Sequence, residues 1–165
     1  MSAINVSLPI STPEGVFMAH YSADGLAGLN FPKSATAAAP AKSATVSKQV
    51  REWHRLTEAA LKSILTGKEP KALPPMVSDG TAFQKSVWKA ISRIGMGKTQ
   101  SYGEIAAAVG RPKAVRAVGS ACGANPIPVL VPCHRVLAAN NQIGGFGSGL
   151  GWKCRLLEAE GVQWG

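Results

Sequence analysis

The chain is poor in acidic residues, in aromatic residues and in long apolar runs. Of its 165 residues only 9 are Asp or Glu and 6% are aromatic, whereas 18 are Lys or Arg and 45% are hydrophobic. This apolar content excludes a disordered chain and predicts a globular protein with a real core. No apolar run approaches the roughly 20 residues that a bilayer-spanning helix needs, so we expect no membrane partner.

Cysteine is also scarce. The three cysteines, Cys122, Cys133 and Cys154, are odd in number and form no CxxC pair. We therefore expect neither a disulfide framework nor a cysteine metal site. The N-terminus lacks a basic stretch followed by an apolar one, which argues against a secretory signal. These absences favour a reducing, cytoplasmic setting, and association with the nucleoid if the source is bacterial.

The charge that is present is unevenly distributed. Residues 1–79 contain 8 Lys or Arg and 6 Asp or Glu, whereas residues 80–165 contain 10 and 3. The excess of positive charge therefore lies in the second half. A basic half-domain suggests a polyanionic partner, of which nucleic acid is the first candidate, although a merely soluble basic surface has the same composition.

The first 66 residues predict a small α/β domain. Turn signals at Thr12–Gly15 and Asp24-Gly25 separate three strand-like segments, which make an antiparallel meander: 3–10, 15–21 and 26–31. Residues 33–47 are rich in Ala, Ser and Pro and predict a mobile loop. Helical spacing then predicts a helix from Ser47 to Leu65. We expect residues 1–66 to be a support domain and residues 67–80, rich in proline, to be a linker.

Residues 81–165 predict a second, helical domain. Thr81 with Gln84, and Ser101 with Glu104, have the spacing of capping boxes that begin two helices. The second of these helices stops at Gly110, and another follows over residues 113–124. A helix, a tight turn with glycine and a helix form the pattern of a helix-turn-helix, whose second helix is the recognition helix.

The expected recognition helix has an unusual composition. Val115, Val118 and Cys122 have the spacing of a core-facing stripe, and most other positions are Ala, Gly or Ser. Small residues permit close approach of another surface. That surface is either another helix of the protein or a nucleic-acid backbone. Arg116, the one long cation among them, favours insertion into a nucleic-acid groove.

An apolar run over residues 127–136 ends in a thiol. It predicts a buried, extended segment in which Pro132 sets the direction of Cys133. His134 and Arg135 beside the thiol raise the local positive potential, which favours thiolate. The competing interpretation is that Cys133 is a small buried hydrophobe, as most lone cysteines are.

The last segment predicts a glycine-rich loop and a helix. Glycines at 144–151 permit close backbone approach to a ligand, although a flexible connector has the same composition; the position just after the thiol segment favours a ligand. The helix over Leu150 to Glu160 places Cys154 on an apolar face with Leu150 and Leu157. Glu160 continues a neighbouring apolar stripe, so its carboxylate is either at the solvated end of this stripe or half-buried with a partner, for which His134 is the candidate.

These residues resemble one known family closely. Pro132-Cys133-His134-Arg135-Val136, preceded by Asn125-Pro126-Ile127-Pro128, resembles the active-site signature of the O6-alkylguanine-DNA alkyltransferases (methylated-DNA–protein-cysteine methyltransferases). The resemblance extends through Ser101–Glu104, Arg116–Gly119 and Leu156–Gly161. It therefore covers residues 80–165 almost without interruption, and residues 1–66 more loosely.

The resemblance implies a fold and a reaction. The fold would be an RNase H-like α/β domain (1–66), then a linker (67–80) and an all-α, winged-helix-like domain with a helix-turn-helix (81–165). The protein would bind double-stranded DNA, flip out an O6-alkylguanine and move the alkyl group irreversibly to its own cysteine. O4-alkylthymine is a second candidate substrate. No cofactor or metal is implied, and we expect a monomer in the free state.

The resemblance also implies roles for individual residues. Cys133 is the acceptor; His134 and Glu160 deprotonate it through a water, and Asn125 holds the preceding turn. Arg116 replaces the flipped base, and Tyr102 helps to rotate it. Backbone carbonyls near Cys133 and Val136 accept from the guanine amino group. The remaining expected substrate or DNA contacts are Ser120, Cys122, Arg135, Val136, Phe146, Gly147 and Ser148.

Two other functions compete with alkyl transfer. A helix-turn-helix protein that senses DNA damage without chemistry would bind the lesion and leave it unchanged. A thiol hydrolase built on Cys133 and His134 would turn over many small acyl substrates, but it has no need of a helix-turn-helix or of Arg116.

Overall fold

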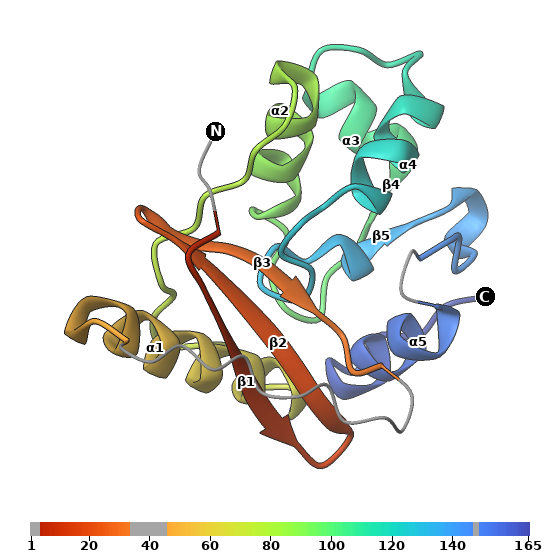
Figure 1. Cartoon of the computed structure of the whole chain (residues 1–165). Coiled ribbons are helices and arrows are strands. Elements are labelled where there is room, and N and C mark those ends of the chain that lie inside the picture. Colours follow the sequence, from red (N-terminus) through yellow and green to blue (C-terminus); the bar gives the residue numbers. More distant parts are fainter. Residues whose placement is uncertain (1–3, 34–45, 147–148) are drawn as a thin grey trace.

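A computed structural model describes residues 4–33, 46–146 and 149–165, and its first part is a three-stranded sheet with one helix (Figure 1). Strands β1 (Val6–Thr12), β2 (Gly15–Ser22) and β3 (Gly25–Asn30) pair antiparallel in the order β1-β2-β3. The predicted meander is therefore confirmed. The loop expected over residues 33–47 lies mostly outside the described residues.

Alternation along β2 explains how the sheet buries one face. Phe17, Ala19 and Tyr21 are each fully buried. Helix α1 (Lys48–Leu65) has Ser47 as its N-cap, and the Ser47 side chain accepts a hydrogen bond from the Val50 amide. These bounds match the helix predicted from Ser47 to Leu65. The Tyr21 hydroxyl lies 2.7 Å from Nδ1 of His54, which joins the sheet to α1.

The segment expected to be a linker adds a short extended stretch beside β3. The Leu26 amide donates to the Pro75 carbonyl and the Val77 amide donates to the Leu26 carbonyl, each at 2.8 Å. Met76 thereby forms a parallel bridge with Leu26. Residues 75–77 are thus held against the sheet by backbone hydrogen bonds.

The second half contains the predicted helices and both predicted capping boxes. The helices are α2 (Ala82–Ile91), α3 (Tyr102–Ala108), α4 (Val115–Gly123) and α5 (Leu150–Ala159). Thr81 with Gln84 caps α2, and Ser101 with Glu104 caps α3. Figure 1 shows α2, α3 and α4 grouped together, with α5 closer to the sheet.

We expected the second half to be all-α, but it also contains two short strands. Strands β4 (Gln100–Ser101) and β5 (Val136–Leu137) form a parallel pair. At two residues each, these strands are too short to show an alternating pattern in the sequence. The pair places the end of the thiol segment directly beside the start of α3.

Only the middle of α4 is covered by the core. Val118 and Ala121 are buried, whereas Val115 is 42% exposed, so the expectation that Val115 faces the core is wrong. The helix begins at Val115 rather than at residue 113, which leaves this side chain in the first turn. The α4 face that carries Val115 and Arg116 is exposed.

The buried apolar side chains of both halves form a single cluster. It extends from Ile10 in β1 to Leu156 in α5 and includes Cys133. Within the described residues, no helix is both long and apolar enough to cross a membrane.

Candidate active site

The segment before the thiol is a tight turn, not the extended strand that was predicted. The Val131 amide donates to the Ile127 carbonyl at 3.0 Å, and Val129 has φ of 75°. Asn125 closes the turn, because its side-chain amide donates to the Val131 carbonyl (2.9 Å) and its oxygen accepts from the Ile127 amide (3.0 Å). Burial was predicted correctly, since Ile127 and Val129 are fully buried. The prediction of an extended segment was wrong because the two hydrogen bonds of the Asn125 side chain hold a turn, although β-branched residues favour an extended chain.

Cys133 begins the short 3-10 helix η1 (Cys133–Arg135) and is 4% exposed. Burial raises the pKa of its thiol, while hydrogen bonding from Asn125 and the charge of Lys153 act in the opposite direction. The positive charge that favours the thiolate is therefore that of Lys153, whereas the sequence predicted His134 and Arg135. The resting thiol is protonated and needs a base.

A buried His–Glu–Arg cluster adjoins the thiol. Nε2 of His134 lies 2.8 Å from Oε2 of Glu160, and both side chains are fully buried. Arg135 donates to Glu160 through Nε (2.8 Å) and a terminal nitrogen (3.0 Å). The inward Glu160 beside His134 agrees with the spacing of the last helix.

The cluster fixes the charge state of its members. Burial alone would raise the pKa of Glu160, but the hydrogen bonds from His134 and Arg135 outweigh it and lower that pKa to about 2. Burial lowers the pKa of His134 despite the opposing effect of Glu160. A neutral His134 then donates from Nε2 to the carboxylate. Its other nitrogen, Nδ1, is buried, has no hydrogen-bond partner among the described residues, and is free to accept a proton.

Arg135 does not lie where a DNA contact was expected. Its residue is 7% exposed, and its guanidinium donates to Glu160 and to the Ile94 carbonyl (2.6 Å). The resemblance implied a substrate or DNA contact, but this side chain points into the protein. A buried guanidinium needs its counter-ion close by, and Glu160 supplies it.

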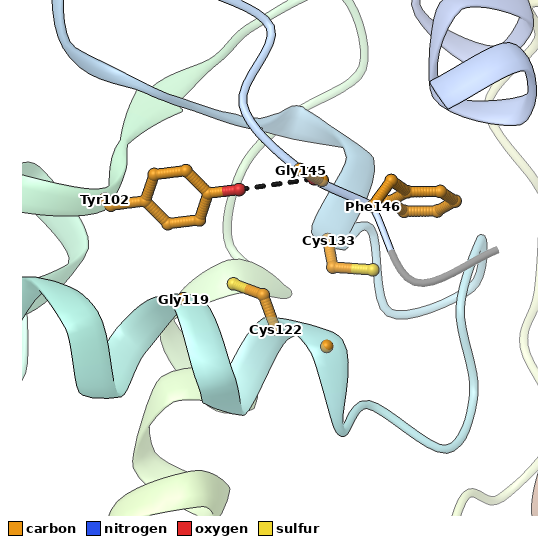
Figure 2. Close-up of a pocket in the computed structure, with 7 residues that line it drawn as sticks. Tyr102, Gly119, Cys122, Cys133, Gly145 and Phe146 are labelled. Atoms are coloured by element: carbon orange, nitrogen blue, oxygen red, sulfur yellow. Dashed lines mark hydrogen bonds between the residues drawn. The ribbon is translucent and has the colours of Figure 1, made fainter. Parts of the chain in front are cut away.

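The thiol lines a cavity of about 330 Å³ between α3, α4, η1 and the glycine-rich loop (Figure 2). The predicted residues Tyr102, Cys122 and Phe146 line it too, and the Tyr102 hydroxyl donates to the Gly145 carbonyl at 3.4 Å. The full lining comprises Tyr102, Gly119, Cys122, Gly123, Cys133, Gly145 and Phe146. Residues from four separate segments thus meet around one sulfur.

The α4 glycines do not serve packing inside the protein. A side-chain carbon added at Gly119 or Gly123 would meet no atom of the described residues within 4 Å. Gly119 and Gly123 therefore do not serve close packing of another helix, whereas Ala121 does pack inside the protein, because it is buried and its carbonyl accepts from the Trp88 ring of α2. Arg116 and Ser120 lie on the same helix with exposed side chains, outside the lining of the cavity.

The other predicted site residues have mixed outcomes. Val136 is fully buried, and its carbonyl accepts from Lys153 at 2.7 Å. Gly147 and Ser148 lie outside the described residues. Cys154, expected in the core, is half-buried, and Leu150 on the same face is 47% exposed. The buried face of α5 instead carries Lys153, Leu156 and Leu157.

Lys153 is the site residue that the sequence analysis missed. It is fully buried, and its ammonium donates to the carbonyls of Val136 (2.7 Å) and Gly145 (3.2 Å). It also lies 5.7 Å from the centre of the Tyr102 ring. A lysine in a helix normally predicts a solvated position, and only its spacing, three and four residues before Leu156 and Leu157, indicated the buried face.

We expect Lys153→Met to slow any reaction of the Cys133 thiolate by about tenfold or more at neutral pH. The substitution removes the positive charge that lowers the pKa of the thiol and leaves two carbonyls without their donor. Rates of thiol alkylation measured against pH check this. The variant should recover toward the wild-type rate at alkaline pH, where thiolate forms unaided.

Arg155→Met is the matched control for Lys153→Met. Arg155 is an exposed cation on the same helix, stacked 4.9 Å over Trp152. It should change the rate by less than about twofold, because exposed charges interact weakly. A similar loss in both variants would show that Lys153 acts only through general surface charge.

The site provides a nucleophile, a neutral buried base and a cavity, but no cluster suited to a metal. Among the residues that the structure describes, no group of three or more His, Cys, Asp or Glu side chains could hold an ion. A thiol that lines a cavity and is followed in the chain by an imidazole oriented by a carboxylate supplies the groups that nucleophilic catalysis uses.

Comparison with known proteins agrees with this arrangement. A family model described as "6-O-methylguanine DNA methyltransferase, DNA binding domain" matches residues 82–162. The methylated-DNA–protein-cysteine methyltransferase of Methanosarcina acetivorans is 49% identical over 111 residues, which cover 67% of this chain and 69% of that protein. The one from Methanosarcina barkeri is 40% identical over 152 residues, which cover 92% and 94%.

A solved structure is similar over nearly the whole fold. The crystal structure of Mycobacterium tuberculosis OGT in complex with DNA superposes with a TM-score of 0.76 at 32% identity. The match covers 94% of this chain and 92% of that one.

Proposed function

The chain belongs to the methylated-DNA–protein-cysteine methyltransferase family, and we propose that it repairs DNA by moving the alkyl group of O6-alkylguanine to the sulfur of Cys133. The observation that carries the assignment to this sulfur is its position at a cavity, while the next residue in the chain, His134, forms a buried pair with Glu160. Each molecule acts once, because a thioether is stable. O4-alkylthymine is a second substrate candidate.

The reaction is a displacement at the alkyl carbon. Nδ1 of His134 takes the thiol proton through a bridging water, and Glu160 stabilises the resulting imidazolium. The sulfur forms a bond to the alkyl carbon as the carbon–O6 bond breaks, and the electron pair passes to the guanine. The guanine then takes up one proton and is restored. Asn125 holds the turn that aims the sulfur.

Recognition of DNA is assigned to α4. Its exposed face of small residues permits close approach to a minor groove, and Arg116 projects there to occupy the space of the flipped base. Tyr102 lines the cavity and contacts the base. Backbone carbonyls near Cys133 and Val136 accept from the guanine amino group, for which Val136 retains one lone pair beside its bond from Lys153. Ser120, Cys122 and Phe146 supply further contacts.

The finer architecture follows the same proposal. Residues 1–66 would be an RNase H-like support domain, residues 67–80 a connection, and residues 81–165 a winged-helix-like domain that carries the chemistry. The antiparallel sheet with α1, and the helix-turn-helix that lies in the chain between the paired strands β4 and β5, support this division. A protein that repairs genomic DNA would act as a monomer in the cytoplasm, at the nucleoid in a bacterium.

We expect Arg116→Ala to slow repair of O6-methylguanine in duplex DNA by about tenfold or more. The Arg116 side chain would no longer fill the gap that the flipped base leaves in the DNA, so flipping the base would cost several kcal/mol without compensation. Reaction with the free base O6-benzylguanine should change by less than about twofold, since no stack is opened. Single-turnover rates on both substrates check this, with Arg51→Ala on α1 as an exposed-cation control. Equal losses on both substrates would contradict the role.

The pH dependence of the single-turnover rate should show a base with a lowered pKa. His134 must be neutral to accept a proton, and burial shifts its pKa below the ordinary value of 6.5. The rate should therefore persist below pH 6.5 before it falls on the acid side. A fall centred above pH 6.5 would exclude His134 in its buried state as the base. Rates from quenched-flow experiments in matched ionic strength give the profile.

The stoichiometry of methyl transfer separates this proposal from its alternatives. Duplex DNA with a radiolabelled O6-methylguanine, in excess, should yield one labelled methyl group on each protein molecule and then no more. A damage sensor would bind the DNA and acquire no label. A thiol hydrolase would show repeated turnover of small esters, and neither outcome is compatible with the proposal.

A further inference from the structure

The end of β3 contacts the turn before the thiol, and the residue that follows β3 contacts the aromatic wall of the cavity. The Leu29 amide donates to the Pro126 carbonyl at 2.9 Å, next to Asn125 in the thiol turn. Phe31, directly after β3, packs edge-to-face on Phe146, with ring centres 5.8 Å apart and planes at 78°. One strand of the N-terminal sheet thus touches both the turn that carries the thiol and the aromatic wall of the cavity.

Phe31 is itself held on two other sides. Its ring centre lies 5.4 Å from that of Phe17 in β2 and 5.0 Å from that of Trp152 in α5. Phe17 and Trp152 pack on each other at 5.3 Å. Phe31 is 9% exposed and Phe17 is fully buried. Rings packed in this way have few alternative positions, so Phe31 presents a fixed edge to Phe146.

Phe146 needs such a support. It follows Gly144, with φ of 71°, and Gly145 in the glycine-rich loop, where the backbone alone restricts a side chain little. Lys153 and Tyr102 both donate to the Gly145 carbonyl and so hold the backbone. Within the described residues, Phe31 is the ring that packs against the Phe146 ring. Figure 2 shows Phe146 next to Cys133, with Tyr102 on the other side of the sulfur.

We propose that Phe31 is a positioning residue that sets which alkyl groups the cavity accepts, by fixing the Phe146 ring as the wall against which the alkyl group packs. The proposal rests on the proposed function and adds the N-terminal sheet to the substrate site. A methyl group buries little area on this wall, whereas a benzyl group packs a whole ring on it. If the Phe146 ring is free to move, the transfer rate of the benzyl group therefore falls more than that of the methyl group.

The test compares O6-methylguanine and O6-benzylguanine placed in the same duplex. We expect Phe31→Leu to lower the single-turnover rate for the benzyl group by about threefold to tenfold, and the rate for methyl by less than about twofold. Phe31→Tyr keeps the ring and should restore the wild-type ratio of the two rates. If Phe31→Leu does not fold, Phe31→Met, which also lacks the ring, is measured in its place.

Tyr21→Leu is the matched control, because Tyr21 is a fully buried ring of the same sheet that packs on His54 and, among the described residues, makes no ring contact with Phe31 or Phe146. It should lower thermal stability and leave the benzyl-to-methyl ratio unchanged. The same ratio in wild type and in the Phe31 variant, or an equal shift in Tyr21→Leu, would overturn the proposal while leaving alkyl transfer intact. A wild-type protein that transfers neither group would overturn both.

Discussion

Cys133→Ser is expected to bind alkylated duplex DNA with unchanged affinity and to transfer its alkyl group at least about a thousandfold more slowly. A hydroxyl ionises far less readily than a thiol and is a poorer nucleophile at carbon, so the buried base network has no effective acceptor to activate. The side chain is nearly isosteric and lies at the end of a turn that Asn125 holds independently. Binding by gel shift and transfer by quenched flow separate the two effects.

Cys154→Ser is the control for this experiment. Cys154 is half-buried on α5 and does not line the cavity, so its replacement should leave the transfer rate within about twofold. Retention of rapid transfer by Cys133→Ser would show that another group accepts the alkyl chain. Cys122, the second thiol in the cavity, would then be the first candidate.

Glu160→Gln should lower the free energy of unfolding by about 3–5 kcal/mol and slow transfer severely. The carboxylate accepts from both His134 and Arg135, all three side chains are buried, and removing its charge leaves the guanidinium without a counter-ion. It also removes the group that orients His134. Urea unfolding gives the stability, and single-turnover rates measured where the variant is folded give the activity.

The stability effect of Glu160→Gln should depend on pH with a definite sign. The folded pKa of Glu160 is about 2, below its ordinary value of 4.5, so its contribution is complete above pH 4.5 and is lost as the pH falls toward 2. The stability difference between wild type and variant should shrink over this window. Glu158→Gln, an exposed change on the same helix, should show little effect at any pH. If Glu160→Gln changed neither the stability nor the transfer rate, the buried cluster would be dispensable.

Much of the fold was predictable because its signals are local. The capping boxes at Thr81 and Ser101, the N-cap Ser47 and the glycine that ends α5 each depend on residues within one turn of a helix. The pairing of Glu160 with His134 followed from the spacing of the last helix together with the position of the thiol segment.

What could not be predicted depends on contacts between distant segments. The turn at Val129 exists because the Asn125 side chain reaches across it, and the β4–β5 pair joins residues that are 36 apart in its register. Arg135 is turned inward by Glu160, 25 residues away, and Lys153 is turned inward by carbonyls of two other segments. The sequence around a charged residue gives no sign of a buried partner elsewhere in the chain. Arg135 was therefore predicted to contact DNA, and the buried Lys153 was missed.

The most direct test is the mass of the protein after reaction with a duplex that contains one O6-methylguanine. The account predicts that the whole protein gains the mass of one methyl group in place of a hydrogen. Peptide mapping should locate it on the sulfur of Cys133, and the guanine should be restored in the DNA. An unmodified protein at a molar excess of lesion, or a methyl group on any other residue, would contradict the account.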